Sequence, residues 1–379
     1  MNVTIVIDEL DMGGAQRVVY ELVKHLNTEK YKLTIICTDG KTDSLLEKQM
    51  LGLQKSGKCK IIFLKSSLLS YINTPFRLLN KIIKRIFRFS AELLILSPLL
   101  KQIKKSNPDI VHAHQRGILA GFWTIKNDIL LLATVHTSPS ATFFRTLEKI
   151  IFKRLIKRRK IVLVGISKYN QDIIKNYWHL DDYSVRYINN GINIEEFASI
   201  THDLFTFINT SRQDKNKNQS LILRAFSRLY NNNNDLIKLI LVGDGETHNS
   251  LKSEAQKLGI AHITEFTGFI TSPKEHLAVS DIYISSAHRE GLSLSALEAM
   301  ACGLPVIATD VGGVRDLAQE NGILIADDDD DALYEAMKKL MNNSELRQTM
   351  GKISKEMVKE FSAPVMAEKY AALYDELTA

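Results

Sequence analysis

The chain has 379 residues, of which 45% are hydrophobic and 24% charged, a composition typical of folded globular proteins that excludes a disordered or fibrous one. Its length exceeds what one hydrophobic core usually supports, so two domains are expected. The net charge of +6 is unevenly divided: the first 190 residues contain 31 Lys and Arg against 15 Asp and Glu, and the remainder contains 18 against 28. The basic first half predicts an anionic partner, either a membrane surface or nucleic acid.

The cysteines and the N-terminal segment predict a cytoplasmic protein. Cys37, Cys59 and Cys302 have spacings typical of neither a disulfide framework nor a zinc site, and buried thiols are the simpler interpretation. The first residues contain no basic segment and reach an acid at Asp8, so we expect a core strand there and not a signal peptide. The longest apolar runs are too short to span a bilayer, so no transmembrane segment is expected.

Short apolar strands alternate with helical patterns along the whole chain. In the first half, a β-branched run at residues 3–7 is followed by a glycine turn and a helix at 15–26. Further buried strands are expected at residues 32–37, 60–64, 110–112, 130–135 and 161–165. The pattern then restarts with strands at residues 205–209, 237–242, 263–266, 281–285 and 305–309. Such alternation is typical of parallel sheets covered by helices on both faces.

This organisation predicts two doubly wound α/β domains, residues 1–188 and 189–379, joined near residues 184–199. The last helical stretch, at about 363–379, has no strand after it and could pack on the N-terminal domain. Ligands of such sheets bind beyond the carboxyl ends of the strands, so informative residues should come directly after strands.

The segment from Ser280 to Gly313 has the features of an anion site. Ser293 is expected to cap a helix at residues 294–302, which Gly303 and the following proline would end. Loop amides around Gly291 and the helix dipole together suit a diphosphate, and Gly291 has no side chain to keep a ligand from the backbone.

Two glutamates accompany this turn. Glu298 would lie in the second helical turn, where a carboxylate could accept hydrogen bonds from a diol such as ribose. Glu290, at the mouth of the loop, is placed to meet the group attached to the distal phosphate. Either glutamate alone is more simply interpreted as a solvated side chain, but the whole run is far harder to obtain by chance.

This segment closely resembles the signature of the family-4 (group 1) retaining glycosyltransferases, which have the GT-B fold of two Rossmann-like domains facing across a cleft. The resemblance implies that Glu298 binds the ribose hydroxyls and that Glu290 lies against the donor sugar. It also implies that amides from Gly291 through Leu292 to Ser293 contact sugar and phosphate.

The similarity extends over nearly the whole chain. Within residues 211–217, Arg212 and Lys217 match the basic pair that holds the donor diphosphate, with Lys215 as a rival for the lysine role. Two cations facing a pyrophosphate stabilise both the bound donor and the leaving group. Ser211 stands where the family usually has glycine, a mild departure.

Two further loops of the second half are similar to the family's donor loops. Gly243 lies in a strand-and-turn segment and is included as a donor contact, although a plain turn is the simpler interpretation. Phe269 resembles the position that reads the nucleobase through backbone groups. Asn193 replaces the aspartate of the segment between the domains, so no catalytic role is assigned to it.

In the first half, paired glycines and a histidine follow strands. Gly14 opens a helix after the first strand, and the resemblance implies that it faces the donor phosphates or the acceptor. Gln16 stands where the family has glutamate. An isolated histidine such as His136 is usually structural, but the resemblance implies that it contacts the transferred sugar.

Two other features invite a metal assignment that we reject. His112 and His114 share one face of a strand, but no third ligand stands nearby. We expect His114 to line an acceptor cleft and His112 to be structural. The five aspartates at residues 327–331 are better explained as a helix N-terminus with acids favoured by the dipole. The resemblance also implies that no metal or other cofactor is essential.

Two stretches, from Arg77 to Arg88 and from Lys149 to Lys160, interleave Lys and Arg with Ile, Leu and Phe at helical spacing. Amphipathic basic helices suit an anionic membrane surface. A solvated helix whose apolar face belongs to the core fits the pattern equally well. Two such stretches in one domain favour the membrane. Nucleic acid is disfavoured, because there is no recognised binding motif and no aromatic platform.

The sequence therefore predicts a retaining glycosyltransferase at the inner face of the cell membrane. It would move a sugar from a UDP-sugar, or a GDP-sugar, to a saccharide or polyprenyl-linked acceptor of bacterial envelope polysaccharide synthesis (capsule, O-antigen or exopolysaccharide). A GT-B sugar-nucleotide epimerase is one alternative, although it would need no acceptor or membrane contact. A non-catalytic membrane-binding scaffold is the other, against which the intact acidic and basic site residues argue.

Overall fold

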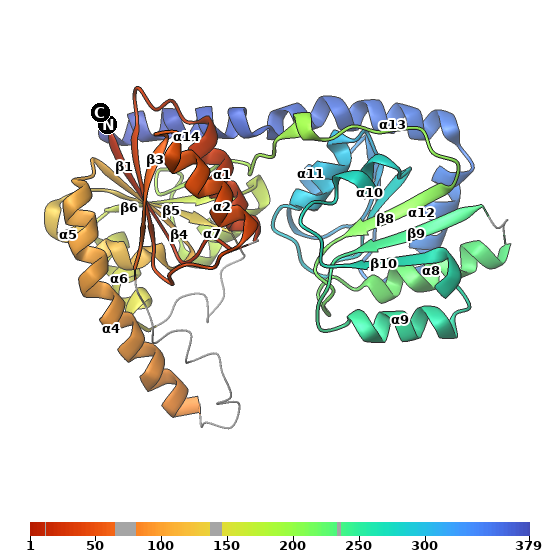
Figure 1. Ribbon diagram of the computed structural model, residues 1–379, viewed down its shortest axis with the longest axis horizontal. Helices are drawn as coiled ribbons and strands as arrows, with labels where there is room; N and C mark the ends of the chain where they lie inside the picture. Colours follow the sequence, from red (N-terminus) through yellow and green to blue (C-terminus); the bar gives the residue numbers. More distant parts are fainter. Residues whose placement is uncertain (12, 65–80, 137–145, 233–235) are drawn as a thin grey trace. The chain divides into compact units, whose positions relative to one another are not determined.

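The computed structural model describes residues 1–11, 13–64, 81–136, 146–232 and 236–379. They form two compact units, one made of Met1–Asn189 with Pro364–Ala379 and the other of Asn190–Ala363 (Figure 1). Each unit is built on its own parallel sheet.

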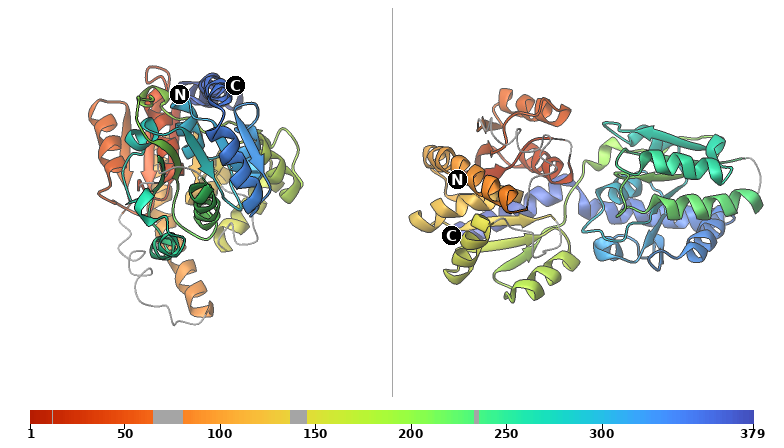
Figure 2. Two further views of the ribbon diagram at one scale, coloured as in Figure 1. Left: turned by 90° about the vertical axis from the view of Figure 1, so that its right-hand side faces the viewer. Right: turned by 90° about the horizontal axis from the view of Figure 1, so that it is seen from below.

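The first unit contains a seven-stranded parallel sheet with the order β3-β2-β1-β4-β5-β6-β7. Its strands are β1 (Asn2–Ile7), β2 (Lys32–Cys37), β3 (Cys59–Phe63), β4 (Ile110–His114), β5 (Leu131–Val135), β6 (Ile161–Gly165) and β7 (Val185–Tyr187). Its helices are α1 (Gly14–His25), α2 (Leu45–Lys55), α4 (Lys81–Ser106), α5 (Gly121–Asn127), α6 (Thr146–Lys157), α7 (Lys168–Trp178) and α14 (Ala363–Thr378), with a 3-10 turn η2 (Gln115–Ala120). Because the order reverses between β1 and β4, right-handed crossovers place helices on both faces (Figure 2).

Apolar residues at helical spacing make the core of this unit. In α4, Ile95, Leu99 and Ile103 recur every four residues and are buried against strand residues such as Val111 and Ala113. The middle strands β4, β5 and β6 are buried along their whole length, which explains their continuous apolar sequence.

The last helix, α14, belongs to the first unit through polar as well as apolar contacts. The hydroxyl of Tyr374 lies 2.7 Å from Nδ1 of His112, and that of Tyr370 lies 2.9 Å from Oγ1 of Thr134. Both tyrosines are fully buried. The helix therefore supplies hydrogen-bonding partners to the interior of a sheet whose first strand begins 361 residues earlier in the chain.

The second unit contains a six-stranded parallel sheet with the order β10-β9-β8-β11-β12-β13. Its strands are β8 (Phe205–Thr210), β9 (Ile237–Val242), β10 (Thr264–Gly268), β11 (Ile282–Ser285), β12 (Val306–Thr309) and β13 (Gly322–Ile325). Its helices are α8 (Gln219–Asn232), α9 (His248–Lys257), α10 (Lys274–Ala278), α11 (Leu294–Ala301), α12 (Asp330–Met341) and α13 (Ser344–Met357), with 3-10 turns η3 (Ile194–Glu196), η4 (Ala261–Ile263), η5 (Gly312–Asp316) and η6 (Val358–Phe361).

The expected class, two doubly wound α/β sheets, is confirmed. The apolar pattern did not reveal β7 and β13, the strands at one edge of each sheet. β7 has three residues of which one is buried, and β13 has one buried residue among four, so neither shows a continuous apolar run. No helix in the described ranges has the length and apolar character needed to cross a bilayer.

The two basic stretches differ in what the structure describes. Residues 77–80 lie outside the described residues, and the remainder of the stretch from Arg77 to Arg88 forms the beginning of α4. In α6, Ile151, Phe152 and Leu155 are buried in the core. Among the described side chains of α6 the apolar ones thus lie mostly in the core, and Ile150, 55% exposed, is on the surface beside the cations.

Candidate functional site

The anion-site segment forms the expected strand, turn and helix. Ser293 caps α11, because its Oγ accepts a hydrogen bond of 3.2 Å from the backbone N–H of Ala296. Beyond Cys302, Gly303 adopts a positive φ of 79° and ends the helix. Both local predictions are confirmed, and α11 begins directly after the loop that carries Glu290.

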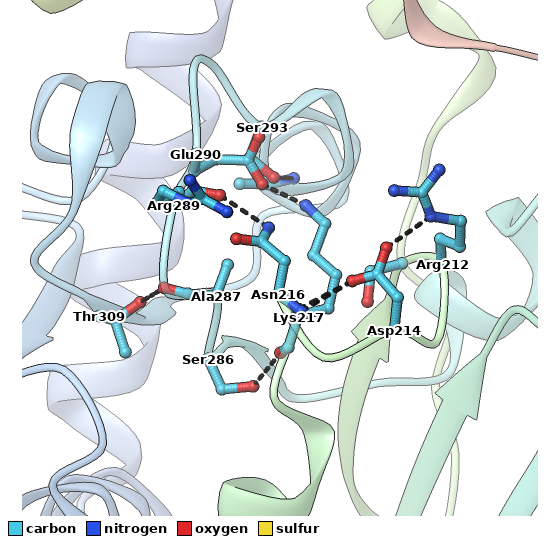
Figure 3. A network of polar contacts seen from close by, with 12 residues as sticks. Arg212, Asp214, Asn216, Lys217, Ser286, Ala287, Arg289, Glu290, Ser293 and Thr309 are labelled. Atoms are coloured by element: carbon cyan, nitrogen blue, oxygen red, sulfur yellow. Dashed lines mark hydrogen bonds and ion pairs between the residues drawn. The ribbon is translucent and has the colours of Figure 1, made fainter. Parts of the chain in front are cut away.

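Every residue from Ser286 to Glu290 is held by a hydrogen bond to another part of the second unit, and Figure 3 shows the bonds of Ser286, Ala287 and Arg289. The bonds are Ser286 Oγ to the Lys217 carbonyl (2.8 Å), Thr309 Oγ1 to the Ala287 carbonyl (2.6 Å), His288 N–H to the Asn216 carbonyl (2.8 Å), Asn216 Nδ2 to the Arg289 carbonyl (3.0 Å) and Gly313 N–H to the Glu290 carbonyl (3.2 Å). The loop is therefore preorganised before any ligand binds.

Gly312 makes the closest approach to this loop. Its φ is +60°, and a Cβ built on it would lie 1.7 Å from the carbonyl oxygen of Glu290. No side chain fits there without moving the loop. The sequence reasoning did not single out Gly312, although a pair of glycines directly after a strand was the available signal.

Two of the expected site side chains, Lys217 and Glu290, form an ion pair between loops 73 residues apart (Figure 3). The Lys217 side chain is 23% exposed and that of Glu290 is 14% exposed. Lys217 is fixed at its backbone, where its N–H donates to Oδ1 of Asp214 at 3.1 Å. Oδ2 of the same Asp214 accepts from Nε of Arg212 at 2.6 Å, and the Arg212 side chain is 77% exposed. Arg212, Lys217 and Glu290 therefore belong to one connected network.

Glu298 lies in the second turn of α11 and is buried. Its neighbour Cys302 is also buried, and burial raises the pKa of that thiol to about 12, with the Glu298 carboxylate adding to the rise. Burial also raises the pKa of the Tyr283 hydroxyl on β11. A hydrogen bond to Ser293 lowers it in part, and the charges of Glu290 and Glu298 raise it further. Tyr283 thus lies near both glutamates, and sequence reasoning missed it.

The other expected donor contacts of this unit follow strands, as anticipated. Gly243 has a φ of +125°, and a Cβ there would lie 2.1 Å from the Ser211 carbonyl oxygen. Close packing of two loops is sufficient to explain this glycine. Phe269 directly follows β10 and its side chain is 63% exposed. Gly291 and Leu292 lie between Glu290 and the cap, in the loop that precedes α11.

In the first unit, the histidines at the ends of β4 and β5 contact one another. Nδ1 of His114 lies 2.8 Å from Nε2 of His136, and the rings of His112 and His114 are 4.3 Å apart between centroids. His112 also contacts Thr134 Oγ1 at 2.8 Å. The structural role expected for His112 fits these contacts. His114, which was expected to line an acceptor cleft, is instead fully buried.

Burial keeps these three histidines neutral. Desolvation lowers the pKa of His112 to about 3 and that of His136 to about 4, and it lowers the pKa of His114 well below its ordinary value. A neutral His136 can donate or accept a hydrogen bond but carries no charge at neutral pH. Gly14, also expected at the site, is the exposed first residue of α1.

The run of aspartates is accounted for by protein partners. Asp329 caps α12 by accepting from the Ala332 N–H at 2.9 Å, so the run contains the capped helix N-terminus that was predicted. Its neighbours contact basic or amide groups: Asp327 with His288 (2.8 Å), Asp328 with Asn218 (3.1 Å) and Asp330 with Arg228 (2.9 Å). Among the residues that the structure describes, no three His, Cys, Asp or Glu side chains gather as metal ligands would.

Two family models match nearly the whole chain between them. The model of the group 1 glycosyl transferases matches residues 193–357, which contain every expected site residue of the second unit. The model of glycosyltransferase family 4 matches residues 12–196, which contain Gly14 and His136. This chain is a family 4, group 1 glycosyltransferase.

Two relatives of this glycosyltransferase have names that specify lipid-linked acceptors. One is the N-acetylgalactosamine-N,N'-diacetylbacillosaminyl-diphospho-undecaprenol 4-alpha-N-acetylgalactosaminyltransferase of Campylobacter jejuni, 23% identical and covering 94% of each chain. Another is the UDP-Gal:alpha-D-GlcNAc-diphosphoundecaprenol alpha-1,3-galactosyltransferase of Escherichia coli, 24% identical and covering 97% of this chain and 94% of the relative.

Solved structures confirm the GT-B fold. HepE of Anabaena in complex with UDP superimposes with a TM-score of 0.77 at 16% identity, over 99% of this chain and 100% of that one. WaaG, a glycosyltransferase involved in lipopolysaccharide biosynthesis, gives a TM-score of 0.70 at 14% identity, over 98% and 99%.

Proposed function

We propose that this glycosyltransferase moves a sugar, with retention of its anomeric configuration, from a UDP-sugar to a polyprenyl-linked saccharide in bacterial envelope polysaccharide synthesis. One observation carries the proposal: Lys217 is paired with Glu290, which lies in a preorganised loop that leads into the Ser293-capped helix of Glu298. The relatives from C. jejuni and E. coli, whose names specify diphosphoundecaprenol acceptors, support the acceptor class. The UDP complex of HepE supports UDP over GDP.

The proposed roles of the site residues are those that the resemblance to the family implies, and their charges support them. Arg212 and Lys217 neutralise the donor diphosphate together with the N-terminus of α11. The buried Glu298 accepts hydrogen bonds from the ribose hydroxyls. Glu290 and the neutral His136 orient the transferred sugar. Amides of Gly291, Leu292 and Ser293 contact sugar and phosphate, and Gly14, Gly243 and the backbone at Phe269 complete the donor contacts.

We further propose a front-face reaction with no essential metal. The bond from the anomeric carbon to the diphosphate breaks as the acceptor oxygen bonds to the same carbon from the same face. The acceptor's proton passes to an oxygen of the departing diphosphate, so nucleoside diphosphate and a lengthened saccharide leave. Positive charge develops on the sugar and negative charge on the diphosphate, where Arg212 and Lys217 stabilise it most in the transition state.

The experiment that tests this function is a transfer assay with Glu298→Ala. UDP- and GDP-sugars would first be screened for thermal stabilisation of the wild-type protein. With the donor that binds, we expect the variant to lose transfer and to bind donor more weakly. NMR of the product should show an α-linkage when the donor is α-linked. Normal turnover by the variant would refute the donor-site assignment, and a β-linked product would refute retention.

We also propose that the protein binds the inner membrane surface peripherally, by charge more than by apolar insertion. In α6 the buried Ile151, Phe152 and Leu155 leave mainly the exposed cations to contact lipid headgroups. In flotation assays, the protein should therefore lose its salt-sensitive binding to anionic liposomes when four basic residues are changed to Gln: Lys153, Arg154, Lys157 and Arg158. Unchanged flotation of that variant would refute membrane binding through α6.

A further inference from the structure

The cations expected to hold the donor diphosphate already have carboxylate partners. Lys217 is paired with Glu290, and Arg212 with Asp214 (Figure 3). A diphosphate that binds Lys217 must therefore compete with the Glu290 carboxylate for the same ammonium group. Like charges repel, so the Glu290 carboxylate opposes binding of the diphosphate at this position.

The two ion pairs differ in whether they can persist when an anion binds. Asp214 also accepts from the backbone N–H groups of Asn216 and Lys217, at 3.0 and 3.1 Å, so its carboxylate is part of the loop itself. Arg212 can keep its Nε on Asp214 and still offer its terminal nitrogens to a phosphate, since a guanidinium has five N–H donors. This pair can persist when an anion binds.

Among the described residues, the Glu290 carboxylate differs from that of Asp214 in accepting from no backbone N–H group. Both backbones are fixed, that of Lys217 by Ser286 and Asp214, and that of Glu290 by the Gly313 N–H. Only the two side chains are free to rearrange. With side-chain exposures of 23% and 14%, the pair is screened less by solvent than a surface pair.

We propose that Glu290 is the resting counter-ion of Lys217 and that a nucleoside diphosphate displaces it. Binding of the diphosphate moves Lys217 from carboxylate to phosphate, and the same exchange releases the Glu290 carboxylate toward the sugar. Glu290 would then be positioned only when a diphosphate is present. This inference rests on the proposed function, because it takes the diphosphate as the ligand of Lys217.

A double-mutant cycle with UDP as the probe tests the exchange. Removing the charge in Glu290→Gln keeps the size of the side chain and the backbone bond to Gly313. Isothermal titration calorimetry should show UDP binding about tenfold more tightly than to the wild type, a change of about 1.4 kcal/mol. The gain should disappear in a Lys217→Met background, where there is no ammonium to release.

Two controls separate this exchange from a general effect of charge. Glu265→Gln removes the same charge from the same unit, where Glu265 pairs with Lys238 at 2.7 Å, and should leave UDP affinity unchanged. Uridine, which lacks the diphosphate, should bind the wild type and Glu290→Gln equally well.

The outcomes distinguish failure of the exchange from failure of the proposed function. If UDP binds the wild type but Glu290→Gln binds it equally or more weakly, the exchange is refuted while the donor site stands. A gain that persists with Lys217→Met, or that appears with uridine, shows that Glu290 does not act through Lys217 and also refutes the exchange. If the wild type binds neither UDP nor GDP, the proposed function itself fails, and the inference with it.

Discussion

Acidification from pH 7 to pH 5 should destabilise the first unit because of the histidines that β4 and β5 bury. His112 and His114 are fully buried, and His136 contacts His114. Their lowered pKa values, about 3 for His112 and about 4 for His136, mean that the folded state stays unprotonated at pH 5. The unfolded chain takes up protons below its ordinary histidine pKa of about 6.5, so protons favour unfolding.

The size of the effect follows from the same difference. One pKa unit is worth about 1.4 kcal/mol, so at pH 5 the fully buried neutral His112 lowers the free energy of unfolding by about 2 kcal/mol. The lowered pKa values of His114 and His136 act in the same direction. The loss from His112 alone is a substantial part of the 5–15 kcal/mol that stabilises a typical domain. Stability is fully present above about pH 6.5 and is lost progressively as the pH falls toward the folded-state values.

Urea unfolding followed by tryptophan fluorescence measures this loss directly. Both tryptophans, Trp123 and Trp178, lie in the first unit and report on it alone. His112→Gln should reduce the difference between pH 7 and pH 5 by about 2 kcal/mol, because one titrating group is gone. The exposed His179→Asn is the matched control and should keep the wild-type difference. An equal free energy of unfolding at the two pH values, or an unchanged difference in His112→Gln, would contradict the argument.

Three further substitutions test the second unit. Gly312→Ala should lower the melting temperature by several degrees and weaken donor binding, because the added Cβ would lie 1.7 Å from a carbonyl oxygen. The matched control is Gly52→Ala in α2 of the first unit, where an added Cβ would meet nothing within 4 Å. That substitution should be neutral or stabilising by up to about 1 kcal/mol. Ser293→Ala should cost about 1 kcal/mol through loss of the α11 cap, and an unchanged melting temperature would show that the cap is dispensable. Desolvation lowers the pKa of His202, but its hydrogen bonds to Asp281 and a backbone carbonyl leave it raised overall, so the stability it contributes is present at low pH and lost as pH rises. The destabilisation caused by His202→Gln should be larger at pH 6 than at pH 8.5, as measured by urea unfolding, and the opposite order would refute this sign.

What the sequence could predict was local. The cap at Ser293 and the glycine stop at Gly303 depend on residues three or four positions apart, and both were predicted. For α12 a capped N-terminus within residues 327–331 was predicted, and the structure shows that Asp329 is the cap. The contacts that organise the site join distant segments. Lys217 meets Glu290 across 73 residues and His114 meets His136 across 22, so no local pattern specifies them.

The basic stretch of α6 shows a second limit. Its apolar residues Ile151, Phe152 and Leu155 have the spacing of a buried helical face, and that spacing is the same whether lipid or protein covers it. The covering surface is supplied by strands elsewhere in the chain. Only the folded structure shows that these three side chains pack in the core.

The position of α14 has a consequence for synthesis of the chain on the ribosome. The hydroxyls of Tyr370 and Tyr374 satisfy Thr134 and His112 inside the sheet of the first unit. Those partners are made only after the whole second unit has been translated. Until then, His112 and Thr134 of the first unit lack these hydrogen-bonding partners. The second unit, whose residues 190–363 are continuous, can fold without such a delay. We expect the unit made first to be the last to reach its final stability.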